Sequence, residues 1–371
     1  MKLLIVSTAP VIYKDKIQFA YSPYVKELVV LEKFADEFIF CCPVWRNEKG
    51  LLITKIPFTV KKHFKLIDFN LGSFSSFFKA FFFSFYNLAV LFKAMKNANH
   101  IHLRCPGNIG LLACLVQVLF PKKIKTAKYA GNWDPQSKQP FSYKLQKWIL
   151  NNTFLTRNMT VLIYGEWKNQ SKNIKPFFTA TYSDSEKEII SKTSLNSTIE
   201  FIFVGSLVLG KSPIYAIKLV QKLIEKKYNV ILNLYGEGPE RKNLENYIQI
   251  NNLEKDIVLH GNKNQEVLKK AYQKSHFVIL PSKSEGWPKA IAEGMFWGCV
   301  PVASKVSCVP FMLDYGSRGL LLEMNLEKDI NMIKEMISDE KIYFTKSRLA
   351  IQWSQNYTVD LFEAEIKKLL S

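Results

Sequence analysis

Short apolar runs of strand length alternate with longer amphipathic stretches through the first half of the chain. We expect strands at residues 2–7, 37–43, 124–130, 160–165 and 176–181, together with one that ends at Arg104. We expect helices at residues 24–34, 74–95, 109–119 and 143–154. The stretch from Thr8 to Pro23 reads as a long loop. Strands that alternate with helices indicate a mostly parallel sheet.

A second alternating set follows a polar stretch at residues 183–198, which we interpret as an interdomain linker. We expect its strands at residues 201–205, 230–236, 257–261, 277–280, 299–303 and 319–322. An amphipathic helix is expected at residues 361–370. A chain of 371 residues is too long for one typical core. The pattern therefore predicts an α/β protein with two sheet domains.

Two apolar segments imitate membrane-directed sequences. MKLLIVSTAP resembles a signal peptide, but its apolar run is shorter than a usual signal core, so we expect a buried strand. The segment Phe74–Met95 is nearly long enough to span a bilayer. Lys79, Ser84 and Asn87 interrupt it, which favours a buried or membrane-surface helix over a spanning one.

Composition narrows the classes of partner. The formal net charge of +19 indicates polyanionic partners, namely nucleotide phosphates, an anionic membrane face or nucleic acid. No arginine-rich run, zinc-finger spacing or RNA-binding aromatic motif favours nucleic acid. We expect reduced cysteines within apolar segments, without a disulfide framework or zinc site, at Cys41, Cys42, Cys105, Cys114, Cys299 and Cys308.

The stretch from His276 to Ser304 contains the most informative pattern. It reads as a strand, a loop with Glu285, a short helix with Glu293 and a second strand. Pro288 suits the first turn of that helix, and Gly298 suits a left-handed cap after it. In a parallel sheet, ligands bind beyond the carboxyl ends of the strands, where Glu285 and the helix start are expected.

The spacing Glu285-x7-Glu293, with Gly286, Pro288, Gly298 and Pro301 around it, resembles the signature of the retaining glycosyltransferases of family 4. The resemblance implies the GT-B architecture, with two Rossmann-like domains that face each other across a cleft. It assigns residues 1–185 to an acceptor-binding domain and residues 199–354 to a domain that binds a nucleotide-sugar donor. It also implies that the final helix, within residues 355–371, packs back on the first domain.

The resemblance implies a set of donor-binding residues in the second half. Lys211 matches a family lysine that holds the donor diphosphate, whereas Ser206 stands where the family has an arginine. By resemblance, Glu293 binds the ribose hydroxyls and Glu285 lies beside the donor sugar. His260 is expected to be structural. The remaining expected donor contacts are Gly205, Gly236, Gly238, Gly286, Trp287, Pro288 and Lys289.

The resemblance is weaker in the first half. Many relatives have a histidine at the position that Ala130 occupies. Asn132 and Asp134 stand just beyond and are candidates for a catalytic role, although Asp134 also suits a turn cap before Pro135. Candidate acceptor-binding residues are Tyr21, Tyr24, Arg104 and Trp133, of which the aromatic ones equally suit a core.

The resemblance implies a retaining hexosyltransferase that uses a UDP- or GDP-linked sugar and a glycan or lipid-linked saccharide acceptor. No Asp-x-Asp motif occurs, so neither a metal ion nor another cofactor is expected. We expect a cytoplasmic protein, peripheral on the inner face of the cytoplasmic membrane. One alternative is a GT-B sugar-nucleotide epimerase or phosphorylase. Another is a sugar-nucleotide-binding scaffold without catalysis, which Ser206 and Ala130 favour.

Overall fold

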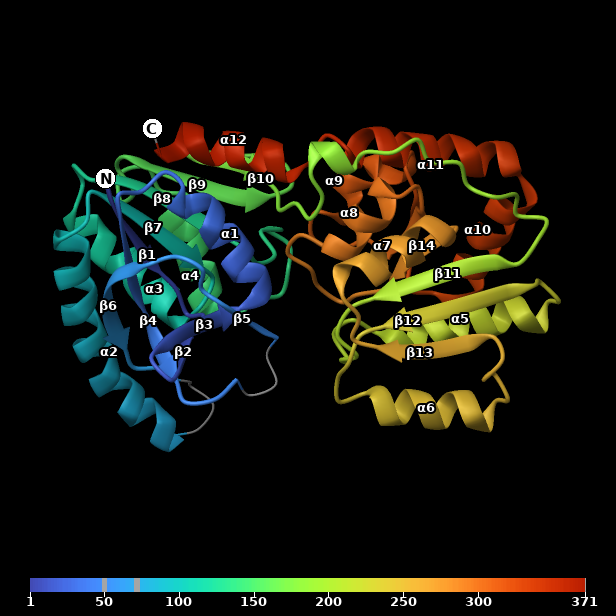
Figure 1. Cartoon of the computed structure of the whole chain (residues 1–371), viewed down its shortest axis with the longest axis horizontal. Coiled ribbons are helices and arrows are strands. Elements are labelled where there is room, and N and C mark those ends of the chain that lie inside the picture. Colours follow the sequence, from blue (N-terminus) through green and yellow to red (C-terminus); the bar gives the residue numbers. More distant parts are fainter. Residues whose placement is uncertain (49–51, 70–73, 371) are drawn as a thin grey trace. The chain divides into compact units, whose positions relative to one another are not determined.

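The computed structural model describes residues 1–48, 52–69 and 74–370. The chain divides into two compact units (Figure 1). Unit 1 comprises Met1–Phe177 and Glu363–Ser371, and unit 2 comprises Phe178–Phe362. The mixed α/β composition with parallel sheets confirms the predicted fold class. Among the described residues, none of the helices has the length and apolar character that crossing a membrane requires.

Unit 1 is built on a sheet with the strand order β10-β9-β8-β7-β1-β4-β2-β3-β5, in which β6 also pairs with β4. Its strands are β1 (Lys2–Val6), β2 (Val11–Lys14), β3 (Ile17–Tyr21), β4 (Glu37–Trp45), β5 (Ile53–Lys55), β6 (Val60–Leu66), β7 (His100–Cys105), β8 (Ile124–Tyr129), β9 (Met159–Tyr164) and β10 (Ile174–Phe177). Its helices are α1 (Ser22–Glu32), α2 (Phe74–Lys96), α3 (Asn108–Val116) with the 3-10 turn η1 (Gln117–Leu119), and α4 (Phe141–Leu150).

The expected loop from Thr8 to Pro23 is wrong, because β2 and β3 form a hairpin there. Lys14 pairs with Ile17, so the turn has only two residues, Asp15 and Lys16. Both have a positive φ, 48° and 68°, as the tight hairpin turn requires. This turn is normally marked by Asn-Gly or Asp-Gly, and the sequence Asp-Lys gives no such signal.

The two faces of the unit 1 sheet differ in chemistry. One face is apolar and packs against α2, α3 and α4, with Leu4, Leu103 and Ala127 among its buried residues. The alternate residues of β7 and β8 are polar and also buried, and they form a ladder in which His100 and His102 both contact Thr126. Arg104 and Lys128 continue this ladder toward the carboxyl ends of the strands.

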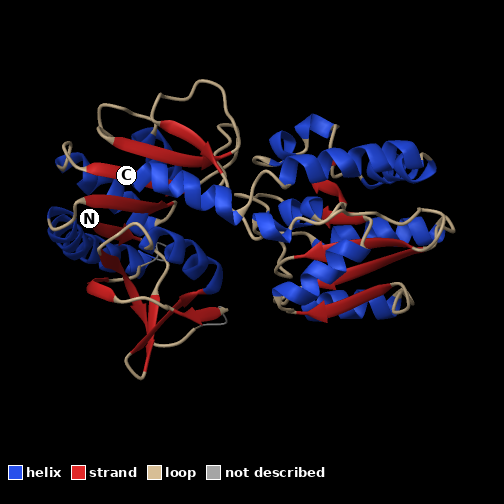
Figure 2. Ribbon diagram, turned by 45° about the horizontal axis from the view of Figure 1, so that its top comes forward, coloured by secondary structure: helices blue, strands red, loops and turns tan. Residues whose placement is uncertain are grey.

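Unit 2 has an all-parallel sheet with the order β13-β12-β11-β14-β15-β16, which is the Rossmann order 3-2-1-4-5-6. Figure 2 shows its strands in red and the helices around them in blue. The strands are β11 (Ile199–Val204), β12 (Val230–Tyr235), β13 (Ile257–Gly261), β14 (Phe277–Leu280), β15 (Val300–Ser304) and β16 (Leu320–Leu322). The helices are α5 (Pro213–Glu225), α6 (Arg241–Ile250), α7 (Gln265–Lys274), α8 (Lys289–Phe296), α9 (Val309–Met312), α10 (Leu326–Ser338) and α11 (Glu340–Ser354), with the 3-10 turns η2 (Asp184–Glu186) and η3 (Asp314–Gly316).

The central strand β14 is covered by both α5 and α8, and none of its residues is more than 2% exposed. Helix α8 begins one residue later than expected. Pro288, predicted in the first turn, stands at the N-cap, and Gly298 follows the helix with φ +79° as predicted. Gly294 lets α8 approach closely, because a Cβ there would meet the side chain of Val278 on β14.

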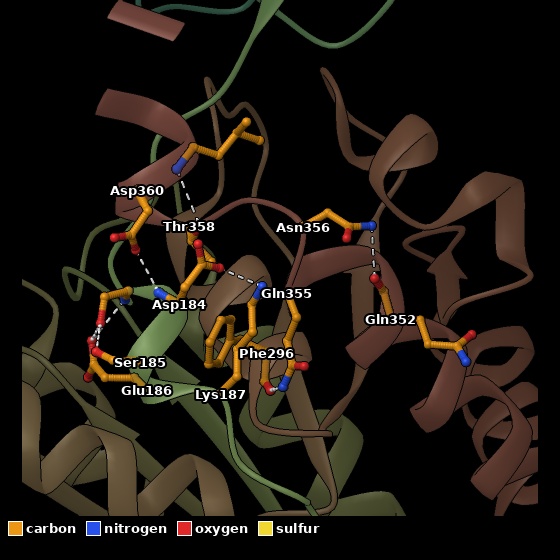
Figure 3. A network of polar contacts seen from close by, with 12 residues as sticks. Asp184, Ser185, Glu186, Lys187, Phe296, Gln352, Gln355, Asn356, Thr358 and Asp360 are labelled. Carbon is orange, nitrogen blue, oxygen red and sulfur yellow. Dashed lines mark hydrogen bonds and ion pairs between the residues drawn. The ribbon is translucent and has the colours of Figure 1, made fainter. Parts of the chain in front are cut away.

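The stretch predicted as a linker belongs to unit 2 and is anchored there. Ser183 and Glu186 form a capping box, and the amide of Asp184 donates to Asp360 at 2.6 Å (Figure 3). Further along, the ammonium group of Lys192 donates to the carbonyl groups of Tyr272, Gln273 and Ser275 at 2.6–2.9 Å. These carbonyls lie at the end of α7, where a cation is favourable.

The last helix, α12 (Val359–Leu370), passes from unit 2 into unit 1. At its start the amide of Val359 donates to the carbonyl of Tyr182, within unit 2. From Glu363 onward its residues belong to unit 1, where Glu363 pairs with Lys33 at 2.5 Å and Glu365 pairs with Lys175 at 2.6 Å.

The close approach of two loops in unit 2 gives a test of the fold. Gly236 has φ +144°, and a Cβ there would run into the carbonyl of Gly205. We expect Gly236→Ala to lower the free energy of unfolding by about 1–3 kcal/mol, because the backbone strain and the collision add. Urea unfolding measures the change. Gly210→Ala is the matched control, since nothing lies within 4 Å of a Cβ there; an equal effect of both substitutions would contradict the reasoning.

Candidate functional site

The strand order of unit 2 reverses between β11 and β14. The chain leaves β11 toward β12 on one side, and β14 continues the sheet on the other. At such a switch point the loops after the two strands diverge and leave a crevice that binds ligands in open α/β sheets. The loop after β11 contains Lys211, and the loop after β14 contains Glu285.

Lys211 and Glu285 form an ion pair at this switch point. The Nζ atom of Lys211 lies 2.5 Å from Oε1 of Glu285. The Glu285 side chain is 6% exposed, whereas that of Lys211 is 29% exposed. The carboxylate is thus held inside the loops and the ammonium group reaches the surface. An incoming anion can contact the lysine without first exposing the glutamate.

Backbone hydrogen bonds join the loops around the crevice. The amide of Lys283 donates to the carbonyl of Gly210 at 2.8 Å, which ties the β14 loop to the β11 loop. The amide of Leu207 donates to the carbonyl of Glu237 at 2.9 Å, which ties the β11 loop to the β12 loop. Neighbouring loops therefore hold one another in place, and the ion pair stands on a fixed backbone.

Ser307 fixes the main chain of Glu285. Its hydroxyl accepts from the amide of Glu285 at 3.1 Å and donates to the carbonyl of the same residue at 2.5 Å. The thiol of Cys308 donates to the carbonyl of Gly286 at 3.0 Å. The loop after β15 thus supports the Glu285 loop. The sequence reading missed Ser307, because a single serine after a strand carries no specific signal.

Glu293 lies on α8, about one turn after the helix begins at Lys289. Its carboxylate accepts from the hydroxyl of Thr181 at 2.7 Å and from that of Tyr272 at 3.2 Å. Burial raises the pKa of Tyr272 well above its usual value, and the negative charge of Glu293 adds to the effect. Tyr272 therefore stays protonated as a donor, and it orients the carboxylate. Neither Thr181 nor Tyr272 was expected at the site.

A small cavity of about 20 Å³ lies beside this carboxylate, with room for little more than one water molecule. It is lined by Glu293, Lys289, Ala292, Phe296, Ser354, Tyr357 and residues 179–182. Lys289 and Glu293 thus share one side of α8, as their spacing predicts. A cation and a carboxylate facing one space are suited to a ligand with both phosphate and hydroxyl groups.

The other expected donor residues differ in their surroundings. Trp287 is 7% exposed, and its ring stacks on that of Trp353 with centroids 6.0 Å apart, so its side chain belongs to the core. Ser206 is exposed in the loop after β11. Gly238 lies against the backbone of Leu207, where a side chain would collide. Gly238, like Gly236, therefore brings two loop backbones together next to the crevice.

His260 has a structural environment. Its Nε2 atom lies 2.7 Å from the side-chain oxygen of Asn233, and its ring stacks on that of Tyr235 with centroids 4.5 Å apart. Burial lowers its pKa, with a smaller contribution from the nearby charge of Lys263. These contacts agree with the prediction that His260 is structural.

In unit 1, the candidate Arg104 is part of a partly buried charge cluster. Glu27 on α1 accepts from Arg104 at 2.7 Å and from Lys128 at 2.8 Å. The guanidinium group lies 4.3 Å from the centroid of the Tyr24 ring. Burial opposes the charge of Arg104, but Glu27, Tyr24 and Tyr164 together outweigh it, and the pKa of the guanidinium is raised. Tyr24 is 5% exposed, so it packs against this cluster and presents little surface to a ligand.

The residues after β8 form a compact turn. The Asn132 side chain accepts from the amide of Asp134 at 2.9 Å, and Oδ1 of Asp134 accepts from the amide of Gln136 at 2.8 Å. Asp134 thus makes the turn-capping contact that was the alternative to a catalytic role. Trp133 is 4% exposed and donates to Gln170, whereas Tyr21 is 42% exposed. Of the aromatic acceptor candidates, Tyr21 has the most accessible ring.

The ion pair can be tested by a double-mutant cycle with Lys211→Met and Glu285→Gln. We expect a coupling free energy of about 1–2 kcal/mol, because the buried carboxylate loses its cation when the lysine is removed. The two single variants and the double variant are compared by urea unfolding.

The control cycle uses the exposed pair Lys222 and Glu225, whose atoms also lie 2.5 Å apart but whose side chains are both 44% exposed. For that pair we expect about 0.3–0.5 kcal/mol. Equal coupling in the two cycles would show that the switch-point pair is not held in a desolvated position.

Comparisons with known proteins agree with this geometry. Residues 184–353 match the family described as glycosyl transferases group 1. An uncharacterized glycosyltransferase of Methanocaldococcus jannaschii is 28% identical over 207 residues, which cover 54% of this chain and 56% of that protein. The UDP-Gal:alpha-D-GlcNAc-diphosphoundecaprenol alpha-1,3-galactosyltransferase of Escherichia coli is 27% identical over 174 residues, which cover 46% of this chain and 44% of that protein. The matches thus span about half the length of these relatives.

Among solved structures, Anabaena HepE in complex with UDP and glucose has a TM-score of 0.67 at 14% identity. That similarity covers 100% of this chain and 99% of HepE, and it establishes the fold. The region that matches the family model, residues 184–353, contains the switch-point pair, the Glu285 loop and α8. The chain therefore has the GT-B fold, and its residues 184–353 match the model of the group 1 glycosyltransferases.

Proposed function

We propose that this protein is a retaining glycosyltransferase that transfers a hexose from a nucleotide-diphosphate sugar to a saccharide acceptor. The observation that carries the proposal is the Lys211–Glu285 ion pair at the switch point of unit 2, beside the start of α8. Transfer of a sugar creates positive charge at the anomeric carbon and negative charge on the departing diphosphate. The site offers one group of each sign within 2.5 Å.

The leaving diphosphate is assigned to Lys211, Lys289 and the amide groups at the start of α8. The first backbone amides of a helix have no intrahelical partner and favour an anion. Two lysines and a helix start can stabilise the developing charge without a divalent ion. We therefore propose that the reaction needs no metal and no other cofactor, with the nucleotide sugar as co-substrate.

The donor sugar is assigned to Glu285 and the ribose to Glu293. A carboxylate can accept hydrogen bonds from both hydroxyl groups of a ribose. Tyr272 and Thr181 orient Glu293, so the ribose would meet a carboxylate whose rotamer is already fixed. Retention of anomeric configuration is assigned to front-face attack, in which the leaving phosphate takes the proton of the acceptor hydroxyl. Asn132 and Asp134 remain candidates for polar contacts with the reacting sugars.

The donor is proposed to be a UDP-sugar. HepE was solved with UDP and glucose, and the Escherichia coli relative is named for UDP-Gal. The acceptor is proposed to be a glycan or a lipid-linked saccharide of a cell-surface polysaccharide or glycolipid, because that relative is named for a diphosphoundecaprenol-linked acceptor. Such an acceptor would place the protein in the cytoplasm, at the inner face of the cytoplasmic membrane.

The test is a thermal-shift series with UDP, GDP, ADP and CMP on the wild type. A ligand at 100 times its dissociation constant should add about 2.7 kcal/mol of stability. We expect UDP to give the largest shift, and Glu293→Ala and Lys211→Met to reduce it. Glu254→Ala, an exposed carboxylate outside the crevice, is the control. A series in which no nucleotide raises the unfolding temperature would overturn the donor assignment.

Turnover then separates the transferase from its alternatives. A transferase releases UDP from a UDP-sugar faster when a saccharide acceptor is added, and it retains the rate in EDTA. An epimerase converts the donor without any acceptor. A scaffold binds UDP and leaves the UDP-sugar intact, which is the outcome that the serine at position 206 would explain. The anomeric configuration of the product, read by NMR, tests retention.

A further inference from the structure

Helix α2 of unit 1 exposes a row of aromatic side chains. Phe81, Phe82 and Phe85 are 56%, 67% and 58% exposed, and Tyr86 and Phe92 follow on the same side of the helix. The opposite side is buried, with Leu91, Ala94 and Met95 at 0%. Rings at this helical spacing form one continuous apolar stripe that no described part of the chain covers. Contiguous exposed apolar surface marks an interaction site.

The neighbouring helices extend this stripe across one side of unit 1. Helix α3 packs against both α2 and α4. The ring of Phe92 contacts that of Phe120, just after η1, with centroids 5.2 Å apart, and Leu119 nearby is 65% exposed. On α4, Phe141 and Trp148 are 79% and 60% exposed, two turns apart. We call the exposed surface of α2, α3, η1 and α4 the aromatic face.

The sequence around the aromatic face is almost free of negative charge. From Phe69 to Gly165 the chain has one acidic residue, Asp134, and twelve lysines and arginines. Several of these cations are exposed on the face itself. Lys93 and Lys96 follow the aromatic row on α2, and Lys144 lies between Phe141 and Trp148 on α4. The face therefore combines apolar rings with positive charge.

We propose that the aromatic face docks on the surface of a lipid bilayer that contains anionic lipids. Rings at an interface enter the boundary between headgroups and acyl chains, while lysines beside them attract the anionic headgroups. A second copy of this chain is a poor occupant, because the two positive faces would repel each other. The proposal deepens the inner-face location given under the proposed function, and it does not depend on donor chemistry in unit 2.

The aromatic face differs from the surface expected from sequence. The basic run Lys61, Lys62 and His63 is a second candidate for contact with an anionic membrane. Lys61 and Lys62 are exposed on β6, but the ring of His63 points inward, where its Nε2 atom lies 3.0 Å from the carbonyl of Cys42 and its Nδ1 atom lies 2.9 Å from the Tyr13 hydroxyl. The side chains of residues 74–80, including Lys79, lie outside the described part of α2.

The experiment is co-sedimentation of the full chain with phosphatidylcholine vesicles, with or without phosphatidylglycerol, in the absence of nucleotide. We expect pelleting with the anionic vesicles at low salt and its loss at high salt. Lys93→Gln with Lys96→Gln should weaken binding about 25-fold, since each lysine near the surface contributes about fivefold. Phe81→Ser, Phe82→Ser and Phe85→Ser together should weaken it by about tenfold or more even at low salt.

Two matched controls lie on α6 of unit 2. Ile250→Ser removes an apolar side chain that is 79% exposed, and Lys242→Gln removes an exposed lysine. Both should bind vesicles as the wild type does. The UDP-induced thermal shift, measured without vesicles, shows that each variant is folded. It also separates a failure of membrane docking from a failure of the donor site.

Four results would overturn the proposal. One is the absence of pelleting with anionic vesicles. A second is equal binding of the aromatic variant and the wild type. The third is a dimer in sedimentation velocity that the same aromatic substitutions abolish while vesicles are not bound, which would assign the face to contact between copies. If RNA, added at the same total negative charge as the vesicles, released the protein from them and bound it more tightly, the aromatic face would be assigned to nucleic acid instead.

Discussion

The ion pair between Lys211 and Glu285 depends on the strand order of unit 2 and on the contacts between its loops. It forms because the sheet order places β11 beside β14, so that two loops distant in sequence begin side by side. A carboxylate that is only 6% exposed is costly unless a cation and a fixed backbone accompany it. Ser307, the Lys283–Gly210 hydrogen bond and the close contact of Gly236 with Gly205 provide that backbone. The charge arrangement is thus a property of the whole sheet edge.

The two units pair a carboxylate with different numbers of cations. In unit 2 the pair has one cation for one carboxylate, with the cation toward solvent. In unit 1, Glu27 is shared by Arg104 and Lys128, so that two cations surround one partly buried carboxylate. Both arrangements lie at the carboxyl ends of parallel strands. Unit 1 retains an excess of positive charge there, and His100 and His102 extend the same polar side of the sheet into the interior.

Much of the fold could be predicted from sequence, because most buried strands are marked by apolar runs and most helices by their amphipathic period. The strands of unit 2 match expectation within two residues, and the segment from His276 to Ser304 has the predicted order. The β2–β3 hairpin could not be predicted, since its turn uses Asp15 and Lys16 in place of glycine. Glu285 and Lys211 could be named from their motifs. Tyr272, Thr181, Ser307 and Glu27 could not, because their roles arise from contacts between segments far apart in the chain.

The path of α12 has a consequence for biosynthesis. Unit 1 is completed by residues from Glu363 onward, and the carboxylates of Glu363 and Glu365 neutralise Lys33 and Lys175. A ribosome delivers these residues only after all of unit 2 has been made. Unit 2 is continuous in sequence, whereas unit 1 lacks part of its surface until the helix arrives. During that interval the side of unit 1 that α12 later covers is exposed to solvent, including the ammonium groups of Lys33 and Lys175.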